Sequence, residues 1–148
     1  MAKWKAALLV SFFLAFPLAG MLIVWFDTHG KIRMRAEEFA MTGADSTFGQ
    51  WSGEAVDANW NAEVDTKRPQ AADWQKWKEA YGEAAGKVTV ESYNSFTSER
   101  KDSMWQVVKL RVHVPGSKKK AVADVEVARM TMGPKWHFES VSVQDDKP

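Results

Sequence analysis

Cysteine is absent from the sequence, which excludes disulfide bonds, thiolate zinc sites, iron–sulfur clusters, cysteine nucleophiles and a lipidated amino-terminal cysteine. An excess of charge of either sign is absent too, because 20 Lys and Arg residues oppose 19 Asp and Glu residues. A formal net charge of +1 gives no strong attraction for nucleic acid or for acidic ligands. We therefore expect neither a nucleic-acid-binding protein nor a thiol-based site.

Motifs for catalysis and metal binding are also missing. The three histidines are His29, His113 and His137, and no second histidine lies two to four residues from any of them. The chain has no Gly-x-Ser-x-Gly motif, no P-loop and no dinucleotide-binding fingerprint. The sequence therefore predicts a protein that is not an enzyme and has no metal or cofactor.

One long apolar run is present, AALLVSFFLAFPLAGMLIVWF at residues 6–26, behind a short basic tail at residues 1–5. Its 21 residues carry no charge, and a helix rising about 1.5 Å per residue would cross a hydrocarbon core of about 30 Å. The run predicts a single transmembrane helix acting as a signal-anchor. A cleaved signal peptide is the alternative, because Lys3 and Lys5 form a basic start and Pro-Leu-Ala-Gly resembles a cleavage region.

Residues around this span predict its position in the membrane. Aromatic and basic side chains prefer the interface between membrane and water. The predicted interface residues here are Trp4, Trp25, Lys31, Arg33 and Arg35. Basic residues flank the span on both sides, so they do not decide the topology. The short amino-terminal tail favours a soluble domain on the outer side, in the periplasm or, in a mitochondrion, the intermembrane space.

Residues 27–71 predict a juxtamembrane helix over 31–41 followed by a loop-rich segment. A short helix is expected at 52–61, with Ser52 as its amino-terminal cap. Hydrophobic residues in such a segment are more typical of a core cover, but in an exposed segment they would be contacts for a partner protein. These candidate contacts are Phe48, Trp51 and Trp60.

A helix is predicted within residues 72–87, capped by Asp73 and ending near Gly82 or Gly86. Trp74, Trp77 and Tyr81 fall on one face of it, which is typical of a helix packed on a sheet. The alternative is that these three aromatic residues line a ligand pocket between the helix and the sheet.

Four strands are predicted at residues 88–96, 103–114, 120–132 and 135–143, before a polar tail at 144–148. Their connections are too short for crossover helices, so the sheet should be antiparallel. Pairing Val114 with Ala121 places Arg111 opposite Asp124 and Lys109 opposite Glu126. This register keeps the apolar residues of both strands on one face and pairs opposite charges on the other. In the last strand the alternation of apolar and polar residues shifts by one position, which predicts a β-bulge near Glu139. Residues 72–143 thus predict an α+β domain with one packed and one solvated face.

The turn between the middle strands carries Lys118, Lys119 and Lys120. Three lysines in a turn are typical of a solubilising loop. They are also candidate contacts for an acidic partner or anionic lipid.

A resemblance to a known family rests on Gly82, on the turn Val114–Lys120 and on the closing strand, with Lys135, Trp136, Phe138, Ser140, Val141 and Val143. Over about residues 74–143 the chain resembles the cytochrome oxidase assembly factor Coa1 and Tim21-like family. The resemblance implies a membrane-anchored module without catalytic machinery that acts as assembly factor or accessory subunit of a membrane complex, such as a respiratory complex. The same order of elements also resembles cystatin-like or NTF2-like envelope domains, which implies a small apolar or aromatic ligand instead.

Overall fold

The computed structural model describes residues 16–21 and 30–147 and divides the chain into two compact units, 1–32 and 33–148. The predicted span at 6–26 lies largely outside the described residues, as do Trp4 and Trp25. Residues 16–21 are helical and exposed. Within the described ranges, no helix is both long enough and apolar enough to cross a membrane.

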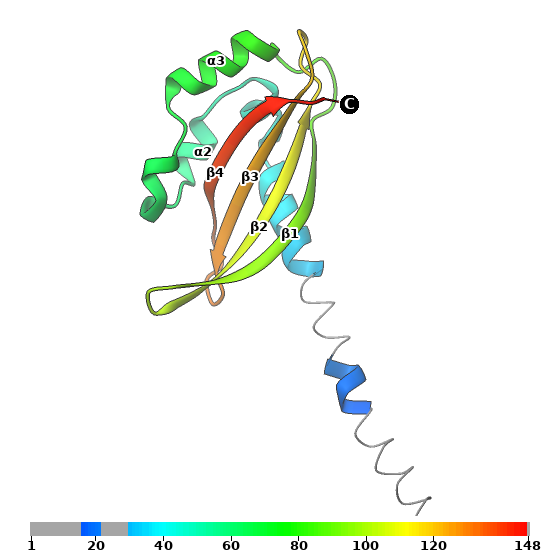
Figure 1. Ribbon diagram of the computed structural model, residues 1–148, viewed down its shortest axis with the longest axis vertical. Helices are drawn as coiled ribbons and strands as arrows, with labels where there is room; N and C mark the ends of the chain where they lie inside the picture. The colour runs from blue at the N-terminus through cyan, green and yellow to red at the C-terminus, as the bar shows by residue number, and fades with distance from the viewer. Residues whose placement is uncertain (1–15, 22–29, 148) are drawn as a thin grey trace, which may run out of the picture. The chain divides into compact units, whose positions relative to one another are not determined.

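The second unit is built on a four-stranded antiparallel sheet, which confirms the α+β prediction (Figure 1). The strands are neighbours in chain order, and they comprise β1 (Thr89–Arg100), β2 (Ser103–Val114), β3 (Ala121–Met130) and β4 (Trp136–Asp145). β1 continues four residues past its predicted end, because β2 supplies partners as far as Ser103.

The predicted register of β2 and β3 is confirmed. Val114 pairs with Ala121, Arg111 with Asp124 and Lys109 with Glu126. The predicted bulge in β4 is also present, because Phe138 and Ser140 pair with consecutive residues of β3 and leave Glu139 without a partner. A second bulge, at Tyr93 in β1, was not predicted.

Helices cover one face of this sheet, with residues 33–41 passing behind the strands in Figure 1. The short helical elements that follow are η1 (Asp45–Gly49), α2 (Glu54–Ala58) and η2 (Ala62–Lys67), and α3 spans Ala71–Tyr81. Phe48 from η1 and Val56 from α2 have no exposed surface. The ring of Phe39 lies 4.9 Å from that of Phe138 in β4, measured between centroids. The core therefore lies between the helices and this covered face.

The helix ends differ in part from their predictions. Gln70, not Asp73, is the amino-terminal cap of α3, and the Asp73 carboxylate accepts the Gln70 backbone N–H at 2.8 Å in a capping box. α2 starts at Glu54 rather than near Ser52, because Trp51 turns the chain with a φ of 55°. α3 ends as predicted before Gly82, whose φ of 73° favours glycine.

The outer edge of β4 is covered by the segment before η2. The Asn61 backbone N–H donates to the Phe138 carbonyl at 2.9 Å, and the Phe138 N–H donates to the Asn59 carbonyl at 2.8 Å. Trp60 forms a parallel bridge with Phe138 between these bonds. This segment therefore protects the edge of β4 from pairing with another chain.

Candidate functional site

The side of the sheet opposite the helices, here called the open face, carries alternating charges. Lys109 and Arg111 lie on β2, opposite Glu126 and Asp124 on β3. The Lys109 Nζ atom is 3.5 Å from Glu126 Oε1, and the Arg111 Nε atom is 3.6 Å from Asp124 Oδ1. The predicted solvated face is thus a ladder of cross-strand ion pairs, with each side chain about a third or more exposed.

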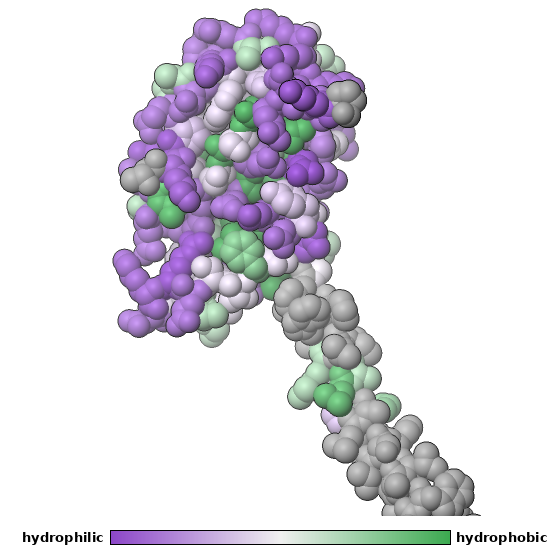
Figure 2. Space-filling model, viewed as in Figure 1, coloured by the Kyte–Doolittle hydropathy of each residue, from purple (hydrophilic) through white to green (hydrophobic). Residues whose placement is uncertain are grey.

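Two exposed aromatic residues of β1 flank this ladder. Tyr93 is 44% exposed and Phe96 is 43% exposed. The Arg111 guanidinium carbon lies 4.7 Å from the centre of the Tyr93 ring, and the Lys109 Nζ atom lies 5.9 Å from that of Phe96. Figure 2 shows this side of the molecule, where hydrophilic residues surround scattered hydrophobic ones. Aromatic rings beside cations are a common composition of protein-binding surfaces.

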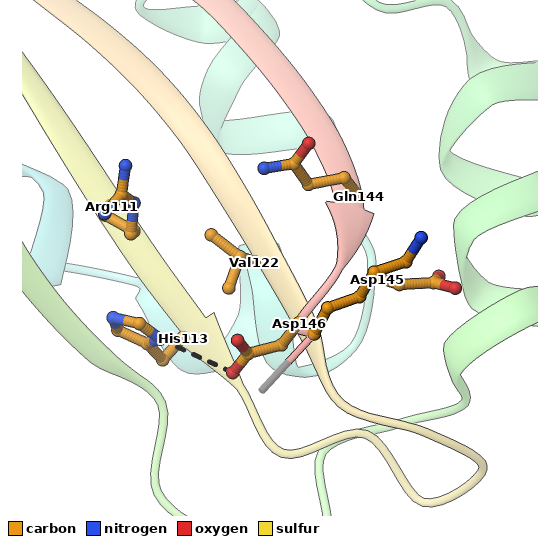
Figure 3. Close-up of a pocket in the computed structure, with 7 residues that line it drawn as sticks. Arg111, His113, Val122, Gln144, Asp145 and Asp146 are labelled. Carbon is orange, nitrogen blue, oxygen red and sulfur yellow. Dashed lines mark ion pairs between the residues drawn. The ribbon is translucent and has the colours of Figure 1, made fainter.

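A depression of about 490 Å³ lies at the carboxyl end of β2 (Figure 3). Its lining consists of Arg111, His113, Val122, Gln144, Asp145, Asp146 and Lys147. His113 Nε2 is 3.0 Å from Glu91 Oε1, and its Nδ1 is 3.7 Å from Asp146 Oδ2. The hydrogen bond from His113 lowers the pKa of Glu91 below its usual range. In the described part of the chain, no group of three His, Asp or Glu residues could hold a metal ion.

The other end of the open face is apolar and closed. Trp105, Val107 and Ala128 form a buried cluster, over which the Arg100 guanidinium lies 5.4 Å from the Trp105 ring. The His137 ring is 6.3 Å from that of Trp105. Burial, with a smaller contribution from Lys135, lowers the pKa of His137 and favours the neutral imidazole.

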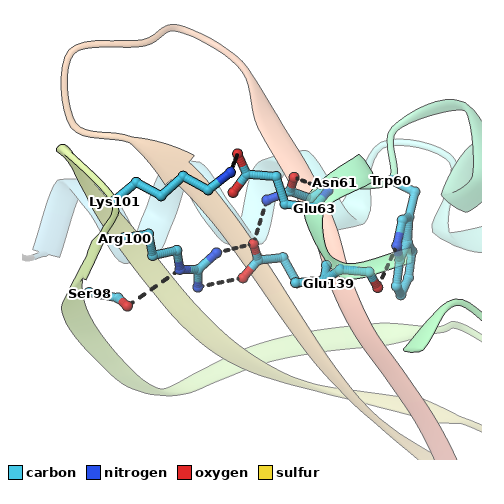
Figure 4. A network of polar contacts seen from close by, with 8 residues as sticks. Trp60, Asn61, Glu63, Ser98, Arg100, Lys101 and Glu139 are labelled. Carbon is cyan, nitrogen blue, oxygen red and sulfur yellow. Dashed lines mark hydrogen bonds and ion pairs between the residues drawn. The ribbon is translucent and has the colours of Figure 1, made fainter. Parts of the chain in front are cut away.

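A buried ion pair joins the two edge strands at this end (Figure 4). Glu139, only 4% exposed, accepts two hydrogen bonds from the Arg100 guanidinium, one of them of 2.7 Å, and one of 2.7 Å from Asn61 Nδ2. The hydrogen bonds to Glu139 raise the pKa of Arg100. Sequence reasoning identified Glu139 only as a bulge position, because no local pattern relates it to a residue 39 positions earlier.

The candidate partner contacts of the loop-rich segment are buried, as the core-cover interpretation of these residues predicted. Phe48, Trp51 and Trp60 are 0%, 3% and 8% exposed. The Trp51 indole N–H donates to the Gly82 carbonyl at 2.7 Å, and that of Trp60 donates to the Val64 carbonyl at 3.2 Å. Their large apolar rings are more favourable in the core than in water, so they cover the sheet and are not free to contact a partner.

The aromatic face of α3 packs against these same rings. Trp74 lies 5.0 Å from Trp77 and 6.1 Å from Phe48, and Tyr81 lies 5.6 Å from Trp51, measured between ring centroids. The Tyr81 hydroxyl donates to Asp145 at 2.8 Å. Burial and this hydrogen bond raise the pKa of Tyr81 to about 12. Aromatic rings thus occupy the position suggested for a ligand.

The lysine turn docks on the end of α3. Its Lys118 N–H donates to the Tyr81 carbonyl at 2.9 Å, and the Lys118 Nζ atom donates to the Glu79 carbonyl at 2.7 Å. Lys119 is 3.0 Å from Asp145, whose pKa it lowers together with Tyr81, while Lys120 is exposed. Two parts of the family resemblance, Gly82 and this turn, are therefore neighbours in the fold.

The basic residues predicted at the membrane interface have different surroundings in the structure. Lys31 belongs to the first unit and is exposed. Arg33 donates to the Ser92 hydroxyl at 3.0 Å and to the Ser92 carbonyl at 2.6 Å. Arg35 is exposed.

Comparison of the chain with protein-family models, curated proteins and solved structures yields no match.

Proposed function

We propose that this protein is a non-enzymatic interaction module that binds another protein through the open face of its sheet. The observation that carries the proposal is the pair of exposed rings, Tyr93 and Phe96, each beside a cation that is itself paired with a carboxylate across the strand. Tyrosine and arginine are enriched in protein interfaces, and a rigid sheet presents them with little loss of conformational entropy on binding.

The packing of the covered face supports binding at the open face. Val108, Leu110, Val112, Val125 and Val127 are at most 1% exposed. The rings of Phe48, Trp51 and Trp74 fill the adjoining layer. These side chains leave little room for a small apolar ligand between helix and sheet, so the interaction module is the better-supported of the two hypotheses.

The proposal includes an anchor and a cellular setting. Residues 6–26 would hold the module in a membrane, with the domain on the outer side, and the partner would be a subunit of a membrane complex. The resemblance to the Coa1 and Tim21-like family supports a role as assembly factor or accessory subunit. Both the anchor and this role are part of the proposal.

The test uses the full-length chain in its own membrane, with a photo-crosslinking amino acid placed at Tyr93 or Phe96. Crosslinked partners are identified by mass spectrometry after mild-detergent purification. The matched control places the same group at Lys76, an exposed residue of α3. We expect subunits of one membrane complex to crosslink at positions 93 and 96 but not at position 76.

A second arm replaces both rings, as Tyr93→Ser with Phe96→Ser, and measures co-purification of the same subunits. A denaturation curve of this variant checks that the domain stays folded. Equal crosslinking at all three positions, or co-purification that the double substitution leaves unchanged, would contradict the proposal.

A further inference from the structure

One end of the sheet in the second unit carries two strand turns (Figure 1). The β1–β2 turn lies at residues 101–102 and the β3–β4 turn at residues 131–135. The Thr131 N–H donates to the Met104 carbonyl at 2.9 Å, and the Gly133 N–H donates to the Met130 carbonyl at 2.8 Å. The second bond lies within the β3–β4 turn, while the first, together with a bond of 3.0 Å from the Thr131 hydroxyl to the same carbonyl, links that turn to the start of β2. The two turns form one surface, here called the tip.

The tip exposes methionine side chains. Met104 is 46% exposed, Met130 is 42% exposed, and Met132, within the β3–β4 turn, is 94% exposed. Single exposed apolar residues are ordinary on a protein surface, but here three unbranched apolar side chains lie in or beside two adjoining turns. Flexible methionine side chains adapt to irregular apolar surroundings.

A basic residue precedes one of these methionines in β3. Arg129, next to Met130, donates to Gln106 Oε1 at 2.7 Å, and its guanidinium lies 5.1 Å from the ring of Trp136. Its Nε atom is buried without a hydrogen-bond partner. Burial and the nearby Arg35 lower its pKa. A cation in this position, beside a second arginine, favours the approach of an anion.

Two lysines of the tip differ in their surroundings. Lys135 is exposed at the end of the β3–β4 turn, and Lys101 lies 3.9 Å from Glu63. The acidic residues of the tip, Glu99 and Asp102, belong to the β1–β2 hairpin. Among the described residues, Arg35, Arg129 and Lys135 form no ion pair with a carboxylate within 4.0 Å.

We propose that the tip rests on an anionic lipid surface, with its methionines among the headgroups and Arg35, Arg129 and Lys135 toward lipid phosphates. This inference rests on the proposed membrane anchor. Only six residues, 27–32, separate the predicted span from Arg33, and even fully extended they reach about 20 Å. Apolar side chains beside basic ones are the composition that binds membrane interfaces. The tip thereby orients the open face relative to the membrane.

The absence of cysteine makes this contact measurable at single positions. Met132→Cys and Lys76→Cys are each labelled with an environment-sensitive fluorophore in the full-length chain. Position 76 is the matched control, because it is exposed on α3, which lies at the other end of the domain from the two turns in Figure 1. The labelled chain is reconstituted into phosphatidylcholine vesicles with or without phosphatidylglycerol, each containing nitroxide-labelled lipid as quencher.

We expect fluorescence at position 132, and not at position 76, to shift to the blue and to be quenched, more strongly with phosphatidylglycerol. Adding Lys135→Glu should reduce the quenching at position 132 in phosphatidylglycerol vesicles. Equal signals from both positions in chains that float with the vesicles would overturn the tip contact alone. Equal quenching with and without phosphatidylglycerol would overturn the preference for anionic lipid. Chains that do not float with vesicles would overturn the anchor and, with it, the tip contact.

Discussion

The two faces of the sheet have opposite chemistry although they alternate along the same strands. On β2, Leu110 is completely buried under the helices, while its neighbours Lys109 and Arg111 point to the open face and are 35% and 41% exposed. Over the middle of the sheet, the covered face is made of valine, leucine and alanine, and the open face of ion pairs flanked by aromatic rings. This difference separates stability from recognition within one sheet, because burial of apolar area dominates folding.

A substitution on each face tests this separation most strongly. Phe48→Ala should destabilise the domain by about 3–5 kcal/mol, because Phe48 has no exposed surface and its removal leaves a cavity. Phe96→Ala on the open face should cost less than about 1 kcal/mol, as surface substitutions usually do. Chemical denaturation of both variants measures the two free energies of unfolding. Equal losses would show that the open face is part of the core.

The buried ion pair of Arg100 with Glu139 should contribute more to stability than the exposed ion pairs of the open face. Removing Arg100 as Arg100→Met should cost about 3 kcal/mol, because it leaves the Glu139 carboxylate buried with only Asn61 as a partner. Replacing both residues, with Glu139→Leu, should cost less than Arg100→Met alone. Double-mutant cycles read by denaturation give these coupling energies.

The matched cycle on the open face uses Lys109→Met and Glu126→Leu. This exposed pair should couple by about 0.2–1 kcal/mol and weaken with added salt. A coupling energy as large as that of Arg100 and Glu139 would contradict the distinction between the two sites.

The smallest expected effect is a loss of stability at high pH, caused by ionisation of Tyr81 in α3. Folding raises the pKa of Tyr81 from about 10 to about 12, so between these values the unfolded chain loses a proton that the folded chain keeps. The contribution of Tyr81 to stability is therefore present below pH 10 and is lost as the pH rises toward 12. Absorbance titration of the phenolate, compared with Tyr81→Phe, should lose its highest-pH step in the variant. A titration unchanged by Tyr81→Phe would contradict this assignment.

Much of the sheet was predictable from local pattern. Alternation of apolar and polar residues predicted four strands, and the requirement that both faces be satisfied fixed Val114 opposite Ala121 and Arg111 opposite Asp124. The helix over 71–81 followed from its aromatic spacing and Gly82. These features depend on neighbours along the chain or across one hairpin, where a shift of one residue would expose the core.

The candidate surface was less predictable. Sequence analysis placed the charges of β2 and β3 correctly on a solvated face, but it gave Tyr93 and Phe96 no role. Whether an aromatic residue is exposed depends on which helices cover which face, and the sequence contains no local signal for that choice. The same reason explains why Phe48 and Trp51, suggested as contacts, lie in the core.

The sequence by itself determined the strand register, the main helix and the absence of thiol chemistry, because each depends on residue type and short-range order. Only the tertiary structure decided that Arg100 reaches Glu139 across the sheet, and that Gly82 meets the lysine turn. It also decided that Met104, Met130 and Met132 gather on one tip. These contacts join residues far apart in the chain, and they form only when burial of the core brings distant segments together.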